Sequence, residues 1–268
     1  MTTDVRDTAD GASEGTTGAA VSAGLRPPDR SGTPGGRREA PPRTLDNPAW
    51  AALTGSHRRL SQRVGAAARY HPDVAPFVAL ADPLDPRGWQ DLAALVGPGT
   101  SFTLAGVHAV PAGWEILHEV EGVQLIATSL RGGPDPEAVR LGAADVPEML
   151  DLVARTRPGP FLPRTVELGA YHGIRRDGRL VAMAGERLRP PGWTEISAVC
   201  TDEAHRGEGL ATRLVRHVAD GIRERGDRPF LHTSAANTRA VRLYESLGFS
   251  LRLRPRFRTL RSPGAPRS

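Results

Sequence analysis

Residues 194–211, TEISAVCTDEAHRGEGLA, form the stretch of sequence that decides the fold of this chain. The first part, residues 195–201, alternates apolar and polar side chains as a half-buried strand does. Gly207 and Gly209 then allow the backbone to turn and to approach a ligand closely, and Arg206 supplies donors that match phosphate oxygens. Because a helix follows, successive backbone N–H groups point at one spot, and the sequence predicts a phosphate-binding site there.

The helix after this loop is predicted from its apolar periodicity. Its apolar residues recur at helical spacing on one face, namely Leu210, Ala211, Leu214, Val215, Val218, Ala219 and Ile222. Gly226 is placed to end the helix. We expect the apolar face to cover a core and the helix N-terminus to face an anion. Strand-to-helix turns also contain glycine for steric reasons alone, so the loop needs a second signal.

That second signal follows Gly226. A short strand is predicted at residues 229–233, and after Asn237 comes a helix that ends in LYESLGF, residues 243–249. With both motifs present, the chain resembles the GNAT superfamily of acyl-CoA N-acyltransferases. Its pyrophosphate-loop pattern, Q/R-x-x-G-x-G/A, and its later N…LYExLGF pattern are matched in order by Arg206, Gly209, Ala211 and the run from Asn237 to Phe249. The resemblance covers roughly residues 135–260.

Composition excludes several other classes of enzyme. The sequence contains no lysine, so all 35 basic residues are arginines, and a Walker A, Schiff-base or pyridoxal-phosphate lysine is excluded. A dinucleotide-binding fold needs a third loop glycine, whereas Ala211 and Thr212 follow this loop. The net charge of +5 is scattered among acidic residues, so we expect no nucleic-acid partner.

Cysteine usage and hydropathy indicate the compartment. The single cysteine, Cys200, rules out an intramolecular disulfide and a CxxC site, and no cluster has metal-ligand spacing. No apolar run approaches the ~20 residues needed to cross a bilayer, and the N-terminus lacks the apolar core of a signal peptide. We expect a soluble, cytoplasmic protein without metal or membrane partner.

The chain divides by composition into three parts. Residues 1–42 contain no aromatic residue and few large apolar ones, so a disordered tail is predicted. Residues 43–130 are predicted to form a small α/β region, with a first helix that begins at Asn47 and Pro48 and carries one apolar stripe, Trp50, Leu53, Leu60 and Val64. A helix at 89–96 and strands at 101–108 and 114–128 complete this region.

A second unit is predicted over residues 135–262. It opens with a strand at 138–141 and a helix capped by Asp145, and continues with a hairpin at 169–188 turned at Asp177 and Gly178. The predicted fold class is α/β with a mixed sheet: a GNAT fold preceded by a smaller, degenerate GNAT-like region. This arrangement resembles the branch that includes glycine N-acyltransferase-like proteins.

The resemblance implies acetyl-CoA as the acyl donor. In GNAT domains two central strands splay apart and the pantetheine arm lies between them. The implied cofactor-binding residues are Val199, Cys200, Thr201, Arg206, Gly207, Glu208, Gly209, Leu210, Ala211, Thr212 and Asn237. Tyr244 matches the family tyrosine near the CoA sulfur that acts as general acid; the alternative is a purely packing aromatic. For Asn237 the alternative is a helix N-cap.

The general base is open on sequence alone. Glu195 begins the strand where several GNAT enzymes carry a catalytic glutamate; Glu167, Glu186 and a water relay compete with it. Cys200 is expected to be a packed thiol, His232 a strand residue with a satisfied hydrogen bond, and His205 an exposed residue that could face the CoA phosphates.

The sequence thus predicts direct transfer of an acyl group from CoA to a primary amine in a ternary complex. The alternative is a non-catalytic acyl-CoA-binding or sensing module, and a third reading has the N-terminal region recruiting a protein to be modified. The acceptor is a small molecule or a peptide amine. Arg157 and Arg164 favour an acceptor that carries a carboxylate.

Overall fold

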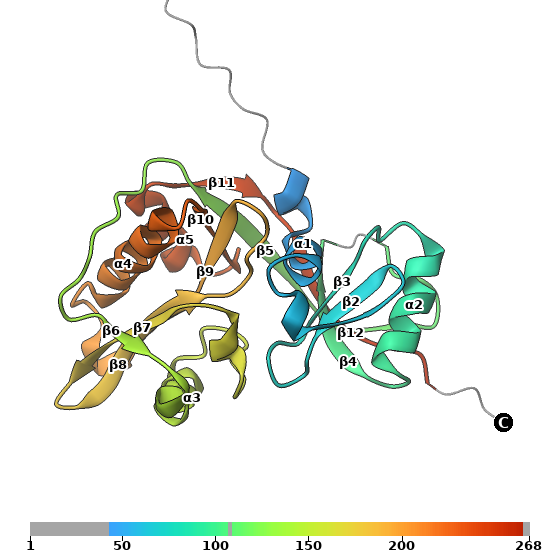
Figure 1. The fold of residues 1–268 in the computed structure, drawn as a ribbon, viewed down its shortest axis with the longest axis horizontal. Helices are drawn as coiled ribbons and strands as arrows, with labels where there is room; N and C mark the ends of the chain where they lie inside the picture. The colour runs from blue at the N-terminus through green and yellow to red at the C-terminus, as the bar shows by residue number, and fades with distance from the viewer. Residues whose placement is uncertain (1–42, 107–108, 265–268) are drawn as a thin grey trace, which may run out of the picture. The chain divides into compact units, whose positions relative to one another are not determined.

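The structure is a computed structural model that describes residues 43–106 and 109–264. The predicted tail at 1–42 and the end of the predicted strand at 101–108 lie outside the described residues. The described part is one sheet of 12 strands in the order β1-β2-β3-β4-β12-β5-β10-β9-β8-β7-β6, with β11 paired to β5 (Figure 1). No helix in this part has the length and apolar character that a bilayer crossing requires.

The C-terminal half contains the strands that the two motifs predicted. Its strands are β6 (Val139–Leu141), β7 (Tyr171–Arg176), β8 (Arg179–Glu186), β9 (Trp193–Thr201), β10 (Arg228–Ser234) and β11 (Phe249–Leu253). Its helices are α3 (Val146–Thr156), α4 (Leu210–Glu224) and α5 (Thr238–Leu247). The predicted hairpin is confirmed: Arg176 pairs with Arg179 across a two-residue turn in which Asp177 and Gly178 both have positive φ.

The N-terminal half has its own strands and two helices. These are α1 (Pro48–Thr54), β1 (Ser61–Val64), β2 (Ala67–Tyr70), β3 (Phe77–Leu80), α2 (Pro86–Val96), β4 (Ser101–Ala105) and the long β5 (Glu115–Ala127). The β12 strand (Arg256–Arg261) joins them from the C-terminal end of the chain. In both halves a single parallel pair, β3 with β4 and β9 with β10, lies among antiparallel neighbours, so the sheet is mixed throughout; that the first half is a degenerate GNAT-like region stays a prediction.

The two halves exchange strands. Residues 115–121 of β5 pair with β12, whereas residues 122–126 of the same strand pair with β10. A strand of the first half therefore completes the sheet of the second half, and β12 returns to lie between β4 and β5. In Figure 1, β5 is the long strand that runs through both halves. The boundary that the sequence placed near residues 130–135 is thus crossed in both directions, and the described residues belong to one compact unit.

The first helix differs from the prediction. The prediction that one helical stripe runs on through Leu60 and Val64 is wrong, because α1 ends at Thr54 and Val64 lies in β1. Gly55 follows the helix, and a Cβ there would lie 2.8 Å from the carbonyl oxygen of Ala51. Gly65, at φ 48°, then opens a two-residue turn that makes β1 and β2 a hairpin.

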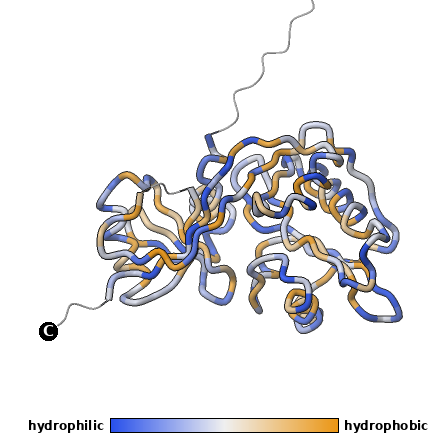
Figure 2. Tube along the Cα trace, turned by 180° about the vertical axis from the view of Figure 1, so that it is seen from behind, coloured by the Kyte–Doolittle hydropathy of each residue, from blue (hydrophilic) through white to orange (hydrophobic). Residues whose placement is uncertain are grey.

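Helices cover opposite faces of the C-terminal sheet. The α4 and α5 helices pack on one face, where their apolar stripes meet Ala182, Ala184 and Ile196. On the other face α3 packs on Met183 and Cys200. Figure 2 shows the apolar residues following the strands, with hydrophilic residues gathered in the peripheral loops. Successive strand residues therefore serve different cores, as the pleat requires.

Candidate functional site

The β9 and β10 strands part in the middle of the sheet. Their parallel pairing covers residues 193–196 of β9 and 228–231 of β10 and then stops. Beyond it, β9 continues to Thr201 paired only with β8, and β10 continues to Ser234 paired only with β5. Along residues 197–201, the backbone N–H and C=O groups on one edge of β9 therefore pair with no neighbouring strand, as the resemblance implied.

A bulge shapes this free edge. Ala198 and Val199 of β9 lie opposite the single residue Ala184 of β8, because the register shifts between the pairs of Ser197 and Cys200. Ala198 has φ 53°, a left-handed conformation that is strained for a residue with a side chain. Bulges of this kind redirect backbone groups next to active sites. The sequence carried no signal for it, since alanine is not a residue that favours positive φ.

The loop after β9 leaves the first N–H groups of α4 without a protein cap. Gly209, at φ 74°, is the N-cap residue of α4, and it offers no side chain to accept from those donors. A Cβ on Gly207 or Gly209 would meet no atom of the described chain within 4 Å. In the first half, by contrast, the Asp85 side chain accepts from the backbone of α2. The N-terminus of α4 thus combines open space with free donors, which suits a phosphate.

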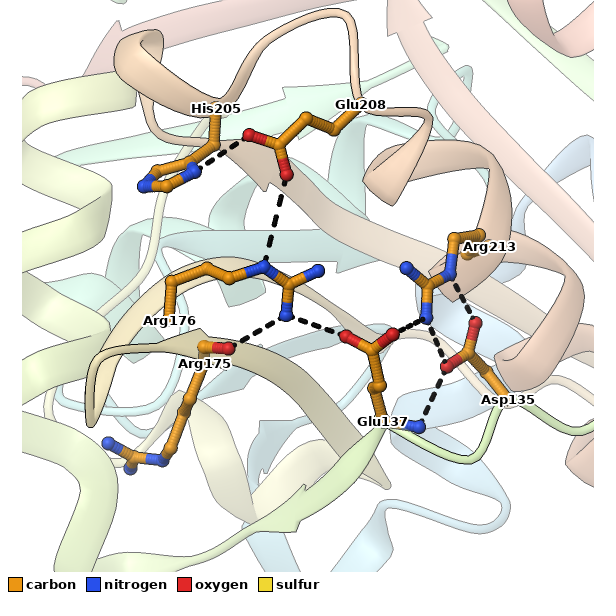
Figure 3. A network of polar contacts seen from close by, with 7 residues as sticks. All are labelled: Asp135, Glu137, Arg175, Arg176, His205, Glu208 and Arg213. Atoms are coloured by element: carbon orange, nitrogen blue, oxygen red, sulfur yellow. Dashed lines mark hydrogen bonds and ion pairs between the residues drawn. The ribbon is translucent and has the colours of Figure 1, made fainter.

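A network of ion pairs holds this loop in place (Figure 3). Arg213 in the first turn of α4 binds Asp135 at 2.6 Å and Glu137 at 2.9 Å. Glu137 also binds Arg176 of the β7–β8 turn at 2.6 Å. Glu208 of the loop accepts from His205 at 2.8 Å and lies 3.9 Å from Arg176. The loop is therefore braced against the hairpin and the segment before β6.

These elements surround a cleft of about 760 Å³. Among the residues that line it are nearly all the predicted cofactor-binding residues: Val199, Cys200, Thr201, Arg206, Gly207, Gly209, Leu210, Ala211, Thr212 and Asn237. Glu208 is not in the lining, since its carboxylate is turned to the network just described. His205 does line the cleft. The geometry thus brings the predicted residues together on one concave surface.

Tyr244 lies in α5 and Asn237 is its N-cap residue, and both line the cleft. Tyr244 packs its ring edge-on against Phe249 at 5.9 Å, and its hydroxyl makes no hydrogen bond to another described residue. Burial, with a contribution from nearby Cys200, raises the pKa of Tyr244 to about 12. The phenol is protonated at neutral pH and can donate. Asn237 accepts from the Ala240 N–H at 3.1 Å, so it is also the N-cap of α5.

Glu195 lies behind the cleft rather than in it. The side chain is fully buried, binds Arg187 through two hydrogen bonds of 2.6 and 2.8 Å, and accepts from His232 at 2.7 Å. Burial alone would raise the pKa of this carboxyl, but the charge and hydrogen bonds of Arg187, with a further contribution from His232, lower it well below its usual range. A carboxylate held in this way is a poor proton acceptor at neutral pH.

His232 is held on both ring nitrogens. The Gln124 amide nitrogen lies 3.0 Å from His232 Nε2 and also donates to the Leu45 carbonyl at 2.9 Å. Arg252 donates to the amide oxygen of Gln124 at 2.8 Å, which fixes the orientation of the amide. That orientation of Gln124 makes His232 Nε2 an acceptor and leaves the proton on Nδ1, which donates to Glu195. His232 is thus the hydrogen-bonded strand residue that the sequence predicted. A row of hydrogen-bonded side chains runs across the sheet from the end of β8 to β5 and consists of Arg187, Glu195, His232 and Gln124.

The competing residues lie apart from the cleft. Glu167 binds Arg164, and neither residue lines it. Glu186 binds Arg225 and accepts from the Ala170 N–H. The described chain holds no group of three or more His, Cys, Asp or Glu side chains fit for a metal ion.

Cys200 packs with the α3 core, and burial raises the pKa of its thiol to about 11. The thiol is therefore protonated at neutral pH and is not an activated nucleophile.

The Glu195 pairing leads to a stability prediction. Glu195→Ala leaves the Arg187 guanidinium buried without its counter-charge, so the free energy of unfolding should fall by about 3–5 kcal/mol in urea titrations. Glu167→Ala, which breaks a partly exposed pair with Arg164, is the control and should cost much less. Equal losses in the two variants would show that the buried pair carries no special weight.

Comparisons with known proteins agree with this geometry. The family model described as FR47-like protein matches residues 171–258. N-alpha-acetyltransferase RimI of Mycobacterium tuberculosis is 35% identical over 129 residues, 43% of this chain and 80% of the relative. A solved GNAT-family protein from Novosphingobium aromaticivorans is 40% identical, with a TM-score of 0.74 over 82% of this chain and 99% of that one. A solved GCN5-related N-acetyltransferase from Kribbella flavida is 20% identical, with a TM-score of 0.54 over 81% of this chain and 95% of that one. At this identity the likeness shows the fold alone.

This chain covers 80% of the first of these relatives and 99% of the second, at 35% and 40% identity. The residues matched by the family model, 171–258, include the parted strands, the glycine loop and the helix that carries Tyr244, which are elements that form the cleft. On this evidence the chain belongs to the GNAT family of acetyltransferases.

Proposed function

We propose that this protein transfers an acetyl group from acetyl-CoA to a primary amine by direct attack within a ternary complex. The observation that carries the proposal is the cleft at the β9–β10 fork, where an unpaired strand edge, an uncapped helix N-terminus and a protonated tyrosine meet. We further propose that the reaction takes place in the cytoplasm, where the lone Cys200 thiol stays reduced.

The residues of the cleft fit acetyl-CoA in a definite order. The N–H groups at the start of α4, with Arg206, would bind the pyrophosphate. The free edge of residues 197–201 would pair with the amides of the pantetheine arm, as a neighbouring strand would. Asn237, the N-cap of α5, and Tyr244 within α5 would line the same arm of CoA, since both face the cleft. The thioester would then lie near the bulge, where an N–H of the Val199 region stabilises the oxyanion.

The chemistry requires one bond to form and one to break. The amine nitrogen attacks the thioester carbonyl carbon, and the carbon–sulfur bond breaks as the amide forms. The amine loses one proton, and the departing thiolate gains one from the Tyr244 hydroxyl. The phenol is then restored from water in the cleft, so atoms and charges balance.

Among the described residues that line the cleft there is no aspartate or glutamate to take the amine proton. Glu195 is buried behind the cleft, and Glu167 and Glu186 bind arginines elsewhere. We infer that Glu195 positions Arg187 and His232, and that the proton leaves to water. The acceptor must then bind as the neutral amine.

This inference gives a pH prediction. As pH rises, kcat/KM should increase and level off near the pKa of the acceptor amine itself, about 7.7–8.0 for a peptide α-amine. Two acceptors whose amine pKa values differ should show inflections that differ by the same amount. Burial raises the pKa of Tyr244 to about 12, so its phenol stays protonated over this range. At pH values up to about 11, kcat/KM should therefore show no decline from ionisation of Tyr244. An inflection fixed at one pH for both acceptors would point to an enzyme base instead.

The proposal is tested by a screen of amines for CoA release from acetyl-CoA. Peptides with a free α-amine belong in the screen, because the M. tuberculosis relative is named an N-alpha-acetyltransferase. We expect at least one class of primary amine to be acetylated. Tight CoA binding with failure of every amine would favour a non-catalytic acyl-CoA-binding module, and acetylation of proteins alone would favour recruitment of a protein substrate.

A further inference from the structure

The charges that line the cleft are all of one sign. Among the described residues of its lining are four arginines, Arg157, Arg187, Arg206 and Arg239, and no aspartate or glutamate. A polycationic acceptor would find no counter-charge there and would be repelled. An acceptor that brings a negative charge would be attracted, provided that some of these arginines are not needed for CoA.

The four arginines divide between the two faces of the sheet. Arg206 lies in the loop before α4 and Arg239 in the first turn of α5, so both lie on the face that these helices cover. Arg157 follows the last residue of α3, which packs on the opposite face. Side chains alternate between the two faces along β8, and Met183 points to the α3 face. Arg187, four residues after Met183, is therefore on the α3 face as well. Two arginines therefore lie away from the proposed phosphate site.

Arg187 keeps one edge of its guanidinium free. Its Nε and Nη2 donate to the two oxygens of Glu195 at 2.8 and 2.6 Å. Burial opposes its charge, but Glu195 raises the pKa of the guanidinium, so it stays protonated. In the described chain Nη1 has no hydrogen-bond partner, and the residue lines the cleft. A positioned cation thus presents a spare donor to whatever occupies that side.

An unpartnered hydroxyl lies in the core that packs on the α3 face of the sheet. Tyr171, at 1% exposure, covers Gly185 so closely that a Cβ there would lie 2.2 Å from its ring. Its hydroxyl is buried without a hydrogen-bond partner among the described groups. Burial raises the pKa of Tyr171, so the phenol is protonated at neutral pH. Tyr171 is not among the residues that line the cleft, so its hydroxyl is not part of the acceptor site.

Arg157 differs from its neighbour Arg155. Arg155 is neutralised by Asp151, at 3.0 Å, and by Asp202. Arg157 is exposed at the cleft, and no carboxylate of the described chain pairs with it. Its backbone has φ 51° because it is the C-cap of α3, where its N–H donates to the Val153 carbonyl, and this conformation fixes where the side chain leaves the helix end. The chain thus holds one unpaired arginine at the α3 rim of the cleft and a second, Arg187, deeper within it.

We propose that the acceptor is an amine that also carries a carboxylate, of the free amino acid class, and that Arg157 and the free edge of Arg187 bind that carboxylate. The inference rests on the proposed function and names the substrate class of the same site. With the carboxylate held on the α3 face, the amine points across the fork to the thioester. Arg164, which is bound to Glu167 away from the cleft, takes no part.

Matched acceptors test the proposal. Amino acids and their carboxamides, identical in side chain, are compared as acceptors at a pH fixed relative to each amine pKa. We expect the acid to exceed the amide in kcat/KM by roughly 10- to 100-fold, the range for charge-assisted hydrogen bonds. Arg157→Gln should reduce that ratio to a few-fold, mainly through KM, whereas Arg164→Gln should leave it unchanged. Arg187→Lys, which keeps a charge beside Glu195 but lacks Nη1, should also reduce it.

A binding measurement separates this proposal from the proposed function. N-acetyl amino acids and N-acetyl amino amides are titrated into the CoA-saturated protein by calorimetry. Preference for the acids that is lost in Arg157→Gln supports the site even if no amine is turned over. Acetylation of amines with no preference for acid over amide, or best activity with polyamines or peptides lacking a nearby carboxylate, overturns the site while the proposed function stands. Absence of binding by either series also overturns it.

Discussion

Replacing Tyr244 with phenylalanine should lower kcat by roughly 10²- to 10⁴-fold while the Kd of CoA stays close to the wild-type value. The tyrosine ring packs against Phe249 and within the α4–α5 core, so phenylalanine preserves the packing. Only the hydroxyl is lost, and this hydroxyl makes no hydrogen bond within the described chain. The stability of the fold should therefore change little. What disappears is the proton for the departing thiolate, which is protonated poorly by water alone.

Tyr70 provides a matched control for this variant. It is buried, and its hydroxyl is 2.9 Å from His57 Nδ1, but it does not line the cleft. Tyr70→Phe should cost about 1 kcal/mol of stability through the lost hydrogen bond and leave kcat unchanged. Kinetics with an acceptor from the amine screen and thermal unfolding of both variants make the comparison. An unchanged kcat in Tyr244→Phe would reduce Tyr244 to a packing residue, and Tyr244→Ala would then act only through its cavity.

The glycine loop and its helix were predictable because their physics is local. A run of Gly207 and Gly209 before an amphipathic helix needs positive φ and leaves free N–H groups wherever the rest of the chain goes. The hairpin at Asp177 and Gly178 is local in the same way, since both turn residues adopt positive φ. The residues that determine these elements are close together in the sequence, and the glycine loop with the first turn of α4 supplies one side of the cleft lining.

The strand exchange could not be predicted, because it depends on pairing between distant segments. The β5 strand reads as one long strand, and nothing in its residues tells which half pairs with β12 and which with β10. The same holds for Glu195. The strand position that made it a candidate base also places it opposite Arg187 and beside His232, and only the folded sheet shows that both partners are there. The bulge at Ala198 is likewise set by tertiary context rather than by propensity.

Gly209→Asp should weaken CoA binding by at least about 100-fold, measured by calorimetry, with little loss of stability. Gly209 has φ 74°, a conformation that aspartate tolerates better than most residues. A Cβ there would meet no atom of the described chain within 4 Å. As the N-cap of α4, the new carboxylate can accept from the helix N–H groups, which offsets part of the backbone strain of a side chain at positive φ. For the same reason the carboxylate occupies the donors and repels the phosphates.

The control for this loss is the same substitution at the other end of α4. Gly226 has φ 82°, and a Cβ there also meets no atom within 4 Å. It follows a helix of 15 residues, about 22 Å from the N-terminus at 1.5 Å per residue. Gly226→Asp adds comparable backbone strain and the same charge, and near the helix C-terminus that charge should lower stability slightly. Its Kd for CoA should match wild type. If Gly209→Asp bound CoA as tightly as Gly226→Asp, the N-terminus of α4 would not be the pyrophosphate site, and the cleft would have to hold CoA in another way.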